Sequence, residues 1–319
     1  MSLPRALVLT AGLGTRLRPL TYVRAKAAVP VNGETLARRV VAWLVSHGIT
    51  DQVLNLHHHP ESIAASIGDG SDLGARVRYS WENPVLGSAG GPRHALDLLV
   101  DDGGTFLLVN GDTLTDVDVG TLLDRHRESQ ALVTMALIPN PQPDKYGGVQ
   151  VSDDGFVTGF TRAGAVRESW HFIGVQAANA EAFRTLEDGV PAESVNALYP
   201  RLMARNPRAV AAFTCRASFR DIGTPADYLR TSVELALQEG DRMARGARLR
   251  CDASARLVRT AVWDDVSIGE HAELVDCIVC DGARIPSGAR YERCAIVAAG
   301  DRPAADGERL DGALLVAPL

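Results

Sequence analysis

Ala6-Leu-Val-Leu-Thr-Ala-Gly-Leu-Gly-Thr-Arg-Leu-Arg-Pro-Leu20 is the stretch around which the chain is organised, and Lys26 follows it closely. Its apolar start predicts a short buried strand that breaks into a glycine loop after Thr10. Gly12 and Gly14 let backbone N–H groups approach an anion closely, and the arginines that follow offer planar forks of donors to phosphate oxygens. The stretch therefore predicts a phosphate site at the end of the first strand.

Two common phosphate-binding motifs do not fit this loop. The Rossmann fingerprint requires a small residue where this chain has Leu17, and the Walker loop requires a Gly-Lys-Ser/Thr run that is absent. A dinucleotide-dependent dehydrogenase would also need an acidic ribose ligand at the end of the second strand, where His57 to His59 stand. The sequence thus argues against both classes.

Lysine is rare in this chain. Among 33 basic residues only Lys26 and Lys145 are lysines. An ammonium group is a compact point charge, so a lysine retained in an arginine-rich chain favours a tight polyanion site, with chance retention at the surface as the alternative.

Composition excludes several other functions. A length of 319 residues suggests one large domain with a smaller appendage. A net charge of −6, with scattered basic residues, argues against nucleic acid as a partner. No apolar run is long enough to span a membrane and no signal-peptide pattern opens the chain, so we expect no membrane partner and a cytoplasmic location.

The first 140 residues alternate strand and helix patterns, which predicts an α/β fold with a Rossmann-like, mainly parallel sheet sandwiched by helices. Strands are expected at 5–10, 51–57, 76–82, 105–110 and 131–138. Helices are expected at 34–47, 60–67, 90–100 and 118–128. Ligands bind such sheets at the carboxyl ends of the strands, where both the glycine loop and Asn110-Gly-Asp112 fall.

The pattern becomes antiparallel after residue 139. Asp153-Asp-Gly155 predicts a hairpin turn, and further strands are expected at 170–177 and 209–215. Helices are expected at 179–187, 194–205 and about 225–239. An insertion of this kind would form the wall that holds a second substrate.

A six-residue period appears from residue 248 to about 298. Val262, Ile268 and Leu274 are spaced by six, and Cys280 and Pro286 continue the phase. Hexad periodicity predicts a short left-handed parallel β-helix. We therefore expect a catalytic domain at 1–240 and a β-helix domain with its tail at 241–319.

Two features could hold a metal ion. Asp112 follows an apolar strand and Asp221 precedes a helix, so both could ligate Mg²⁺ together with substrate phosphates, although each also suits a turn or a helix cap. Cys277 and Cys280 could form half of a zinc site, but no second pair follows, so small apolar fillers in a repeat are the preferred interpretation.

Together these motifs resemble the sugar-1-phosphate nucleotidylyltransferase family. The resemblance covers residues 5 to about 238 and is closest to mannose-1-phosphate guanylyltransferases and N-acetylmuramate-1-phosphate uridylyltransferases. The motifs that carry it are Leu9-Thr-Ala-Gly-Leu-Gly-Thr-Arg16, Lys26, Leu86-Gly-Ser-Ala-Gly-Gly91, Val109-Asn-Gly-Asp112, Lys145-Tyr-Gly-Gly148 and Asp221-Ile-Gly-Thr-Pro225. The hexad tail is similar to that of family members with a C-terminal β-helix.

The resemblance implies in-line attack of a sugar 1-phosphate on the α-phosphorus of a nucleoside triphosphate, with Mg²⁺ as cofactor. The implied catalytic residues are Arg16, Lys26 and Asp112, and the implied metal ligands are Asp112 and Asp221. The implied nucleotide-binding residues are Thr10, Ala11, Gly12, Leu13, Gly14, Thr15, Arg16, Gly87, Ser88, Ala89, Gly90, Asn110 and Gly111. The implied sugar-phosphate-binding residues are Lys145, Tyr146, Gly147, Gly148, Arg162, Glu168 and His171.

The chain departs from the family pattern at three places. The usual Pro-Lys-Pro around the loop lysine is Ala25-Lys-Ala27, which keeps the charge but loses rigidity. Phe160-Thr-Arg-Ala-Gly164 stands where many members carry a lysine for the sugar phosphate, so Arg162 or Arg167 would have to replace it. The third is Trp170-His-Phe-Ile-Gly174, where the resemblance places the strand that usually meets the sugar.

The resemblance leaves the substrates open. Glu82-Asn-Pro-Val-Leu-Gly-Ser-Ala-Gly-Gly-Pro92 favours GTP with mannose 1-phosphate or a related sugar phosphate, whereas other stretches favour UTP. A non-catalytic regulatory subunit that binds a nucleotide-sugar is a further alternative, although such a protein would be expected to lose Lys26 or an aspartate. The C-terminal domain predicts a homo-oligomer.

Overall fold

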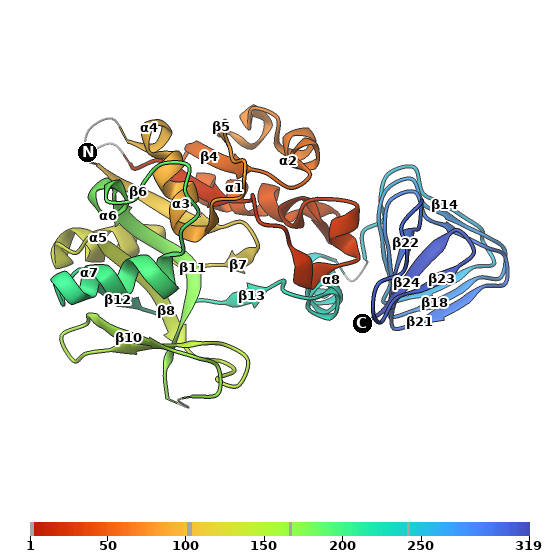
Figure 1. The fold of residues 1–319 in the computed structure, drawn as a ribbon. Coiled ribbons are helices and arrows are strands. Elements are labelled where there is room, and N and C mark those ends of the chain that lie inside the picture. Colours follow the sequence, from red (N-terminus) through yellow and green to blue (C-terminus); the bar gives the residue numbers. More distant parts are fainter. Residues whose placement is uncertain (1–2, 101–103, 166–167, 241–242) are drawn as a thin grey trace. The chain divides into compact units, whose positions relative to one another are not determined.

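A computed structural model describes residues 3–100, 104–165, 168–240 and 243–319 (Figure 1). The chain forms two compact units, one of Met1–Gly12 with Ala37–Arg220 and the other of Leu13–Leu36 with Asp221–Leu319. The glycine loop after Gly12 thus belongs to the same unit as the C-terminal repeats. The predicted boundary after residue 240 follows the sequence pattern rather than this division and stays a prediction.

A mixed sheet forms the centre of the first unit. Its parallel half has the order β5-β4-β1-β6, with β1 between β4 and β6. These strands are β1 (Ala6–Leu9), β4 (Asp51–Leu56), β5 (Arg76–Trp81) and β6 (Thr105–Asn110). All four were expected from their short apolar runs, and their boundaries agree with the predictions to within about one residue.

The other half of the sheet contains antiparallel pairs. Strand β11 (Trp170–Asn179) pairs antiparallel with both β6 and β8 (Val133–Pro139), and β12 (Val210–Thr214) lies parallel to β8. Strands β8 and β12 therefore run in the same direction as β6. The hairpin β9 (Gly148–Val151) and β10 (Val157–Thr161) extends the sheet at β11. The strand expected at 131–138 therefore does not continue the parallel order, because β11 is inserted between it and β6.

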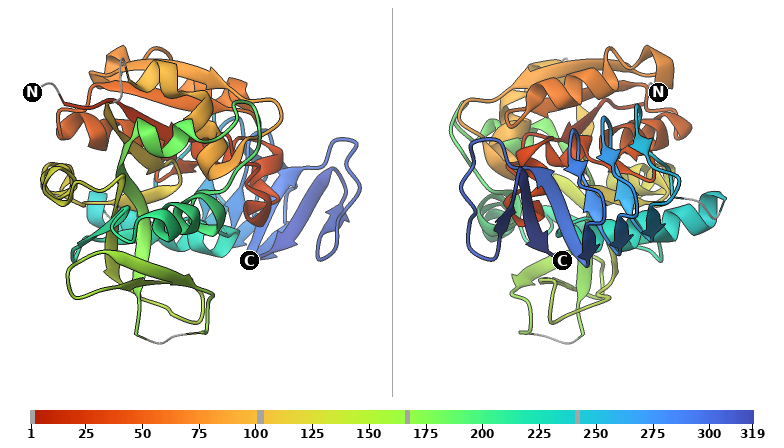
Figure 2. Two further views of the ribbon diagram at one scale, coloured as in Figure 1. Left: turned by 60° about the vertical axis from the view of Figure 1, so that its left-hand side comes forward. Right: turned by 90° about the vertical axis from the view of Figure 1, so that its right-hand side faces the viewer.

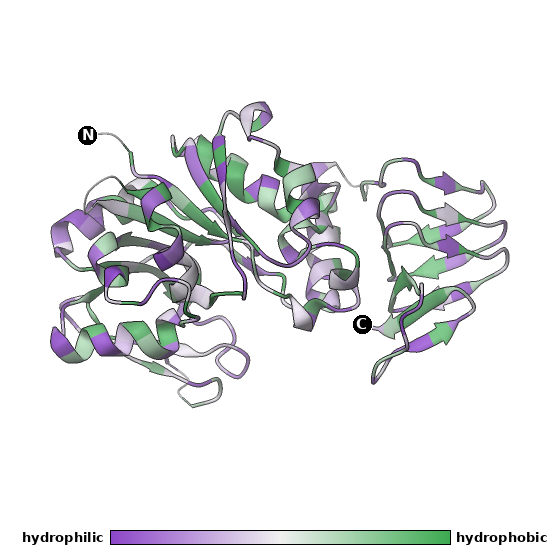
Figure 3. Cartoon of the chain, turned by 45° about the horizontal axis from the view of Figure 1, so that its top comes forward, coloured by the Kyte–Doolittle hydropathy of each residue, from purple (hydrophilic) through white to green (hydrophobic). Residues whose placement is uncertain are grey.

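Helices cover both faces of this sheet (Figure 2). They are α1 (Leu36–Ser46), α2 (Pro60–Ile67), α3 (Gly87–His94), α4 (Leu96–Leu99), α5 (Val119–Ser129), α6 (Ala180–Arg184) and α7 (Tyr199–Arg205). The main core between sheet and helices includes Leu7, Val53, Phe106, Phe183 and Tyr199. Hydrophobic residues accordingly lie along the central strands in Figure 3.

Three helix predictions need correction. The helix expected at 34–47 begins at Leu36, because Glu34–Thr35 forms β3 and pairs with β2 (Pro30–Val31). The helix expected at 90–100 begins at Gly87 and is interrupted at Ala95. The helix expected at 194–205 starts as a π-helix over Ser194–Leu198.

The C-terminal repeats form a three-sided parallel β-helix, as predicted (Figure 1). Its three faces are β14-β17-β20, β15-β18-β21 and β16-β19-β22. The strands are β14 (Arg250–Cys251), β15 (Arg256–Val258), β16 (Ala261–Val262), β17 (Ser267–Ile268), β18 (Glu273–Val275), β19 (Ile278–Val279), β20 (Arg284–Ile285), β21 (Arg290–Glu292) and β22 (Cys294–Ala298).

The repeat of this β-helix is shorter than three hexads. Equivalent residues of successive coils are 17 apart, as in the pair Arg259 and Asp276. The predicted phase holds for Val262, Ile268 and Leu274, but the next interior residues are Val279 and Ile285. The extension of the phase to Pro286 was wrong, because one of the three steps in each coil has five residues and leaves Pro286 exposed.

The tail closes the last coil. Strand β24 (Leu314–Pro318) pairs antiparallel with β22, and β23 (Arg309–Asp311) pairs with β24. The same unit contains α8 (Pro225–Glu239) and three short turns of 3₁₀ helix at Thr15–Leu17, Leu20–Tyr22 and Lys26–Ala28. Two further short strands are β7 (Thr113–Thr115) and β13 (Phe219–Asp221). Among the described residues, no helix has the length and apolar character needed to cross a membrane.

The corrected phase makes a prediction for stability. Ile285→Ala removes a buried side chain from the β-helix interior and should lower the free energy of unfolding by about 2–4 kcal/mol. Pro286→Ala changes an exposed residue and should cost less than about 1 kcal/mol. Urea unfolding of the two variants checks this, and an equal or larger effect at Pro286 would contradict the 17-residue repeat.

Candidate active site

A buried polar chain fixes the end of β1. The backbone N–H groups of Thr10 and Ala11 donate to the Asn55 side-chain oxygen at 2.6 and 3.3 Å. Asn55 in turn donates to one oxygen of Glu82 at 2.7 Å, and the other oxygen of Glu82 accepts the Leu86 N–H at 2.7 Å. Asn55 and Glu82 are only 3% and 1% exposed. The chain therefore joins the start of the glycine loop to the start of the Leu86–Gly91 segment.

Sequence reasoning assigned no role to Asn55 or Glu82. Their signal was a polar side chain at the end of an apolar strand, in Leu54-Asn55-Leu56 and in Trp81-Glu82. Buried polar groups are almost always hydrogen-bonded, so such positions point to a structural brace near a ligand site.

The glycine loop itself is closely packed around Gly14. Gly14 has a left-handed backbone conformation (φ 61°), and a Cβ there would lie 2.8 Å from Thr21 Cγ2 and 3.1 Å from Lys26 Cβ. The Thr21 hydroxyl donates to the Gly14 carbonyl at 3.0 Å. The structure thus brings the predicted residues Gly14 and Lys26 together. A Cβ on Gly12 would contact nothing within 4 Å.

Asp221 and Arg16 both have side-chain atoms close to Gly223. A Cβ on Gly223 would lie 3.1 Å from a carboxylate oxygen of Asp221, 3.4 Å from one of Asp227 and 3.6 Å from Arg16 Nη1. Asp227 is committed to the N-terminus of α8, where it bonds the Thr224 hydroxyl and forms an ion pair with Arg230. Gly223 thus lies close to both the Asp221 carboxylate and the Arg16 guanidinium.

Asp112 lies at the end of the strand next to β1. Leu9 is the register partner of Asn110, and the Gly111 N–H donates to the Leu9 carbonyl at 3.0 Å. A Cβ at Gly111 would be only 2.7 Å from that carbonyl oxygen. On the other side, a Cβ at Gly174 in β11 would lie 2.6 Å from the Asn110 amide nitrogen. These two glycines allow Asn110 to Asp112 to sit tightly between β1 and β11.

The predicted nucleotide-binding residues Gly87 to Gly90 form the first turn of helix α3. The N–H groups of Ala89 and Gly90 both donate to the Ala192 carbonyl, at 2.9 and 3.2 Å, and the Ser88 hydroxyl donates to Glu193 at 2.7 Å. The first turn of α3 is therefore covered by the segment around Ala192. Sequence reasoning missed this segment because it lies about 100 residues further along the chain.

A cavity of about 530 Å³ opens beside the β9–β10 hairpin. Its lining includes four of the predicted sugar-phosphate residues, namely Gly147, Gly148, Arg162 and His171. It also includes Asn196, from the π-helix, which the sequence did not indicate. Irregular helical turns are frequent at functional sites. Lys145, Tyr146 and Glu168 do not line this cavity, although Tyr146 lies against His171.

His171 lines this cavity and is packed between aromatic rings. Its ring packs against Tyr146 and Phe219 at centroid distances of 4.5 and 4.7 Å. Within the described residues, neither buried ring nitrogen has a hydrogen-bond partner. Burial lowers the pKa of His171 to about 4. The imidazole is therefore neutral near pH 7, where it can both donate and accept a hydrogen bond but supplies no charge.

The predicted metal ligands suit magnesium by chemistry. Asp112 and Asp221 offer carboxylate oxygens, and Mg²⁺ commonly takes one or two carboxylates together with substrate phosphates. No group of three or more His, Cys, Asp or Glu side chains gathers in the described parts of the chain. A site of this composition would need oxygens from the substrate to complete it. Cys277, considered above for zinc, lies in the β-helix interior, 3.8 Å from the Cys294 sulfur.

Residues 5–238 match the family model described as Nucleotidyl transferase. The match spans well over half of the chain, and the chain therefore belongs to this family. The resemblance inferred from the glycine loop and the strand-end aspartate is confirmed.

Curated relatives cover most of the chain. The mannose-1-phosphate guanylyltransferase of Mycobacterium tuberculosis is 30% identical over 305 residues, which is 90% of this chain and 83% of the relative. The UTP–glucose-1-phosphate uridylyltransferase of Synechocystis is 25% identical over 90% of this chain and 83% of its own. The crystal structure of HddC from Yersinia pseudotuberculosis has a TM-score of 0.65 at 20% identity and covers 73% of this chain and all of that one, so it supports the fold.

Gly14→Ala tests the packing of the loop. The added methyl would strain the left-handed backbone and collide with Thr21, so nucleoside triphosphate binding should weaken by at least about tenfold. Gly282→Ala is the matched control, because Gly282 has a similar φ of 70° but open space around it. Calorimetric titration measures the affinity, and equal effects of the two variants would contradict the assignment.

His171 should make the protein acid-sensitive. Its pKa is about 4 in the folded state and near 6.5 when unfolded, so the unfolded state binds the extra proton in between. Stability from this group is complete above pH 6.5 and is lost as the pH falls towards 4, by about 2 kcal/mol at pH 5.

His171→Gln should remove that loss. The free-energy difference between wild type and variant, from urea unfolding, should shift by about 2 kcal/mol between pH 8 and pH 5 in favour of the variant. His126, whose pKa is also lowered by burial, is present in both proteins and cancels. A difference that does not change with pH would show that His171 titrates normally.

Proposed function

We propose that the protein is a sugar-1-phosphate nucleotidylyltransferase that condenses GTP with mannose 1-phosphate or a related sugar 1-phosphate. The observation that carries the proposal is the 30% identity, over 90% of this chain, to a mannose-1-phosphate guanylyltransferase. The cavity beside the hairpin adds support, because Arg162, His171 and Asn196 in its largely apolar lining offer polar groups to a small hydroxylated phosphate.

The proposed reaction is a single displacement. An oxygen of the sugar phosphate forms a bond to the α-phosphorus, the bond from that phosphorus to the β-phosphate oxygen breaks, and pyrophosphate leaves with the electron pair. No covalent link to the protein is required. The protein must therefore hold the two phosphates in line and neutralise their charge.

The glycine loop supplies the triphosphate contacts in this proposal. Gly12 to Arg16 would offer backbone N–H groups and a guanidinium, and the Lys26 ammonium would lie against the α- and β-phosphates. The close packing of Lys26 Cβ against Gly14 supports a shared role for these residues. Thr10 and Ala11 would act differently from the prediction, since their N–H groups are used by Asn55.

The cavity beside the hairpin would hold the sugar phosphate. Arg162 would supply positive charge in place of the family lysine, and neutral His171 with Asn196 would bond sugar hydroxyls. Arg167, the other replacement considered, lies outside the described residues. Glu168 is exposed and outside the cavity lining, so it is a less favoured contact.

Mg²⁺ is the proposed cofactor, held by Asp112 and Asp221. When bound, it would neutralise the charge that develops on the triphosphate as pyrophosphate leaves. We further propose a cytoplasmic location, and a homo-oligomer formed through the C-terminal domain, whose β-helix repeats are the sequence evidence for assembly.

Uridylyl transfer is the second candidate. The Synechocystis relative is named a UTP–glucose-1-phosphate uridylyltransferase and covers the same share of this chain, at 25% identity. Pyrophosphate release distinguishes the candidates when each nucleoside triphosphate is crossed with mannose, glucose and N-acetylmuramate 1-phosphates. GTP with mannose 1-phosphate should be the most active pair. Binding of a nucleotide-sugar without activity in any pair would instead indicate a regulatory subunit.

Asp112→Asn and Asp221→Asn test the metal assignment. Each removes a carboxylate that would hold Mg²⁺, so each should lower kcat by about 100-fold or more. Asp124→Asn is the control, because Asp124 is an exposed helix residue paired with Arg127. Near wild-type rates for both active-site variants would mean that the metal is held elsewhere.

A further inference from the structure

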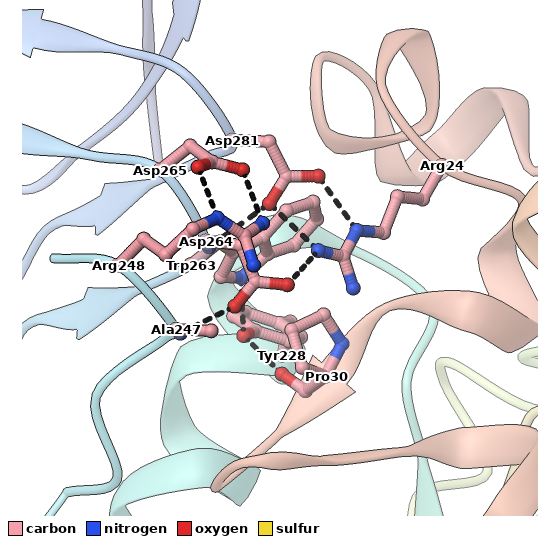
Figure 4. A network of polar contacts seen from close by, with 9 residues as sticks. All are labelled: Arg24, Pro30, Tyr228, Ala247, Arg248, Trp263, Asp264, Asp265 and Asp281. Carbon is pink, nitrogen blue, oxygen red and sulfur yellow. Dashed lines mark hydrogen bonds and ion pairs between the residues drawn. The ribbon is translucent and has the colours of Figure 1, made fainter. Parts of the chain in front are cut away.

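Arg24 connects the glycine-loop segment Leu13–Leu36 to the β-helix (Figure 4). Its Nε and Nη2 atoms donate to the two oxygens of Asp281 at 2.6 and 2.8 Å, and Nη2 also donates to Asp264 at 2.7 Å. The Arg24 side chain is 19% exposed and lies 5.5 Å from the Trp263 ring centroid. One guanidinium is thus held by two carboxylates and an aromatic ring.

The two carboxylates occupy one corner of the β-helix. Asp264 follows β16 and Asp281 follows β19, at equivalent places in successive coils. Asp281 also accepts the Asp264 N–H at 3.0 Å, and Asp264 accepts the Ala247 N–H at 2.6 Å. The acceptors are therefore oriented by the coils themselves before Arg24 binds.

A second group of contacts holds the far end of the same segment. The Trp263 indole donates to the Tyr228 hydroxyl at 2.8 Å, and that hydroxyl donates to the Pro30 carbonyl at 2.5 Å (Figure 4). Trp263 and Tyr228 are each only 1% exposed. Asn32 accepts the Ala244 N–H at 2.8 Å. Helix α8 and the β-helix therefore contact the segment Leu13–Leu36 on both sides of Lys26.

The electrostatics favour Arg24 at this corner. Burial lowers the pKa of its guanidinium, but hydrogen bonds and charge from Asp281, and then from Asp264, outweigh that effect and leave the pKa raised. Without Arg24, two carboxylates on successive coils would face each other without a shared cation. Lysine could supply the charge but not the two-pronged donor geometry.

Local rigidity near Lys26 must come from such contacts. Only Ala25 separates Arg24 from Lys26, and Ala25 precedes the short helical turn Lys26–Ala28. Alanine on both sides of Lys26 restricts the backbone less than proline would. Fixing Arg24 therefore limits the movement of the Lys26 backbone.

We propose that the β-helix contributes to nucleotide binding. The Arg24–Asp281–Asp264 ion-pair cluster holds the glycine-loop segment Leu13–Leu36 in the conformation that binds the triphosphate. The proposal rests on the proposed function for the identity of the ligand. Arg24 is a positioning residue that acts through Lys26 and the loop. This contact would give the C-terminal repeats a role in addition to the proposed homo-oligomer formation.

The test compares Arg24→Ala, Arg24→Lys and Asp281→Asn in the full chain. The matched control is Arg248→Ala, which breaks an equally short pair with Asp265 at the same corner but touches no loop residue. Hydrogen exchange should speed up within residues 13–36 in Arg24→Ala and Asp281→Asn and stay unchanged in the control. Arg24→Lys should lie between wild type and Arg24→Ala.

Steady-state kinetics supply the second readout. Arg24→Ala should raise KM for the nucleoside triphosphate by about tenfold while KM for the sugar phosphate stays within about twofold. A general loss of folding would raise exchange throughout the chain and both KM values together. Unchanged exchange in residues 13–36, or equal effects of Arg24→Ala and Arg248→Ala, would overturn the proposal.

The exchange experiment also separates this inference from the proposed function. Hydrogen exchange needs no substrate. If the wild-type protein released no pyrophosphate with any pair of nucleoside triphosphate and sugar 1-phosphate, the proposed function would be refuted. The exchange result would still decide whether Arg24 holds the segment Leu13–Leu36.

Discussion

Parallel pairing of β1 with β4 and β6 is the constraint on which the site depends. It brings the ends of three strands to one edge of the sheet, where backbone groups that leave the ladder need new partners. Asn55 satisfies Thr10 and Ala11, and Gly111 donates to Leu9. The glycine loop can leave β1 in a fixed direction because these groups are satisfied within the protein.

Glycine has two purposes at this edge. Gly14 and Gly174 both have a left-handed backbone that is closely packed, on Thr21 and on Asn110, whereas Gly111 is needed because the Leu9 carbonyl comes too close for a Cβ. The site is therefore built from close backbone approach, with few side chains of its own. In the proposed site, charge would come from a small number of residues, such as Lys26 and Arg162.

Sequence reasoning found the elements whose evidence is local. The apolar runs predicted β1, β4, β5 and β6 nearly to the residue, and Pro60 with Gly68 marked both ends of α2. It predicted a strand at 170–177 in an antiparallel region, but not its position between β6 and β8, because periodicity does not contain the pairing order. The five-residue step of the β-helix was missed because two correct six-residue steps, from Val262 to Leu274, made a strict repeat plausible.

The candidate site shows the same limit. Gly147, Gly148, Arg162 and His171 were recognised from motifs and do line one cavity. Three contacts were missed, because each involves a segment distant in the sequence. They are Asn196 in the cavity lining, the hydrogen bond from Ala89 to Ala192, and the ion pair of Arg24 with Asp281. The chemical roles of the predicted residues stay predictions, since geometry alone does not identify a substrate.

The central claim is that a sugar phosphate oxygen forms the new bond to the α-phosphorus and that pyrophosphate leaves with all of its oxygens from the triphosphate. The most direct measurement is ³¹P NMR of the products formed from GTP, Mg²⁺ and mannose 1-phosphate in which all phosphate oxygens are ¹⁸O. The account predicts that the nucleotide-sugar keeps all of the label, including the bridging oxygen, and that pyrophosphate contains none. Label in pyrophosphate, or in free GMP, would contradict it.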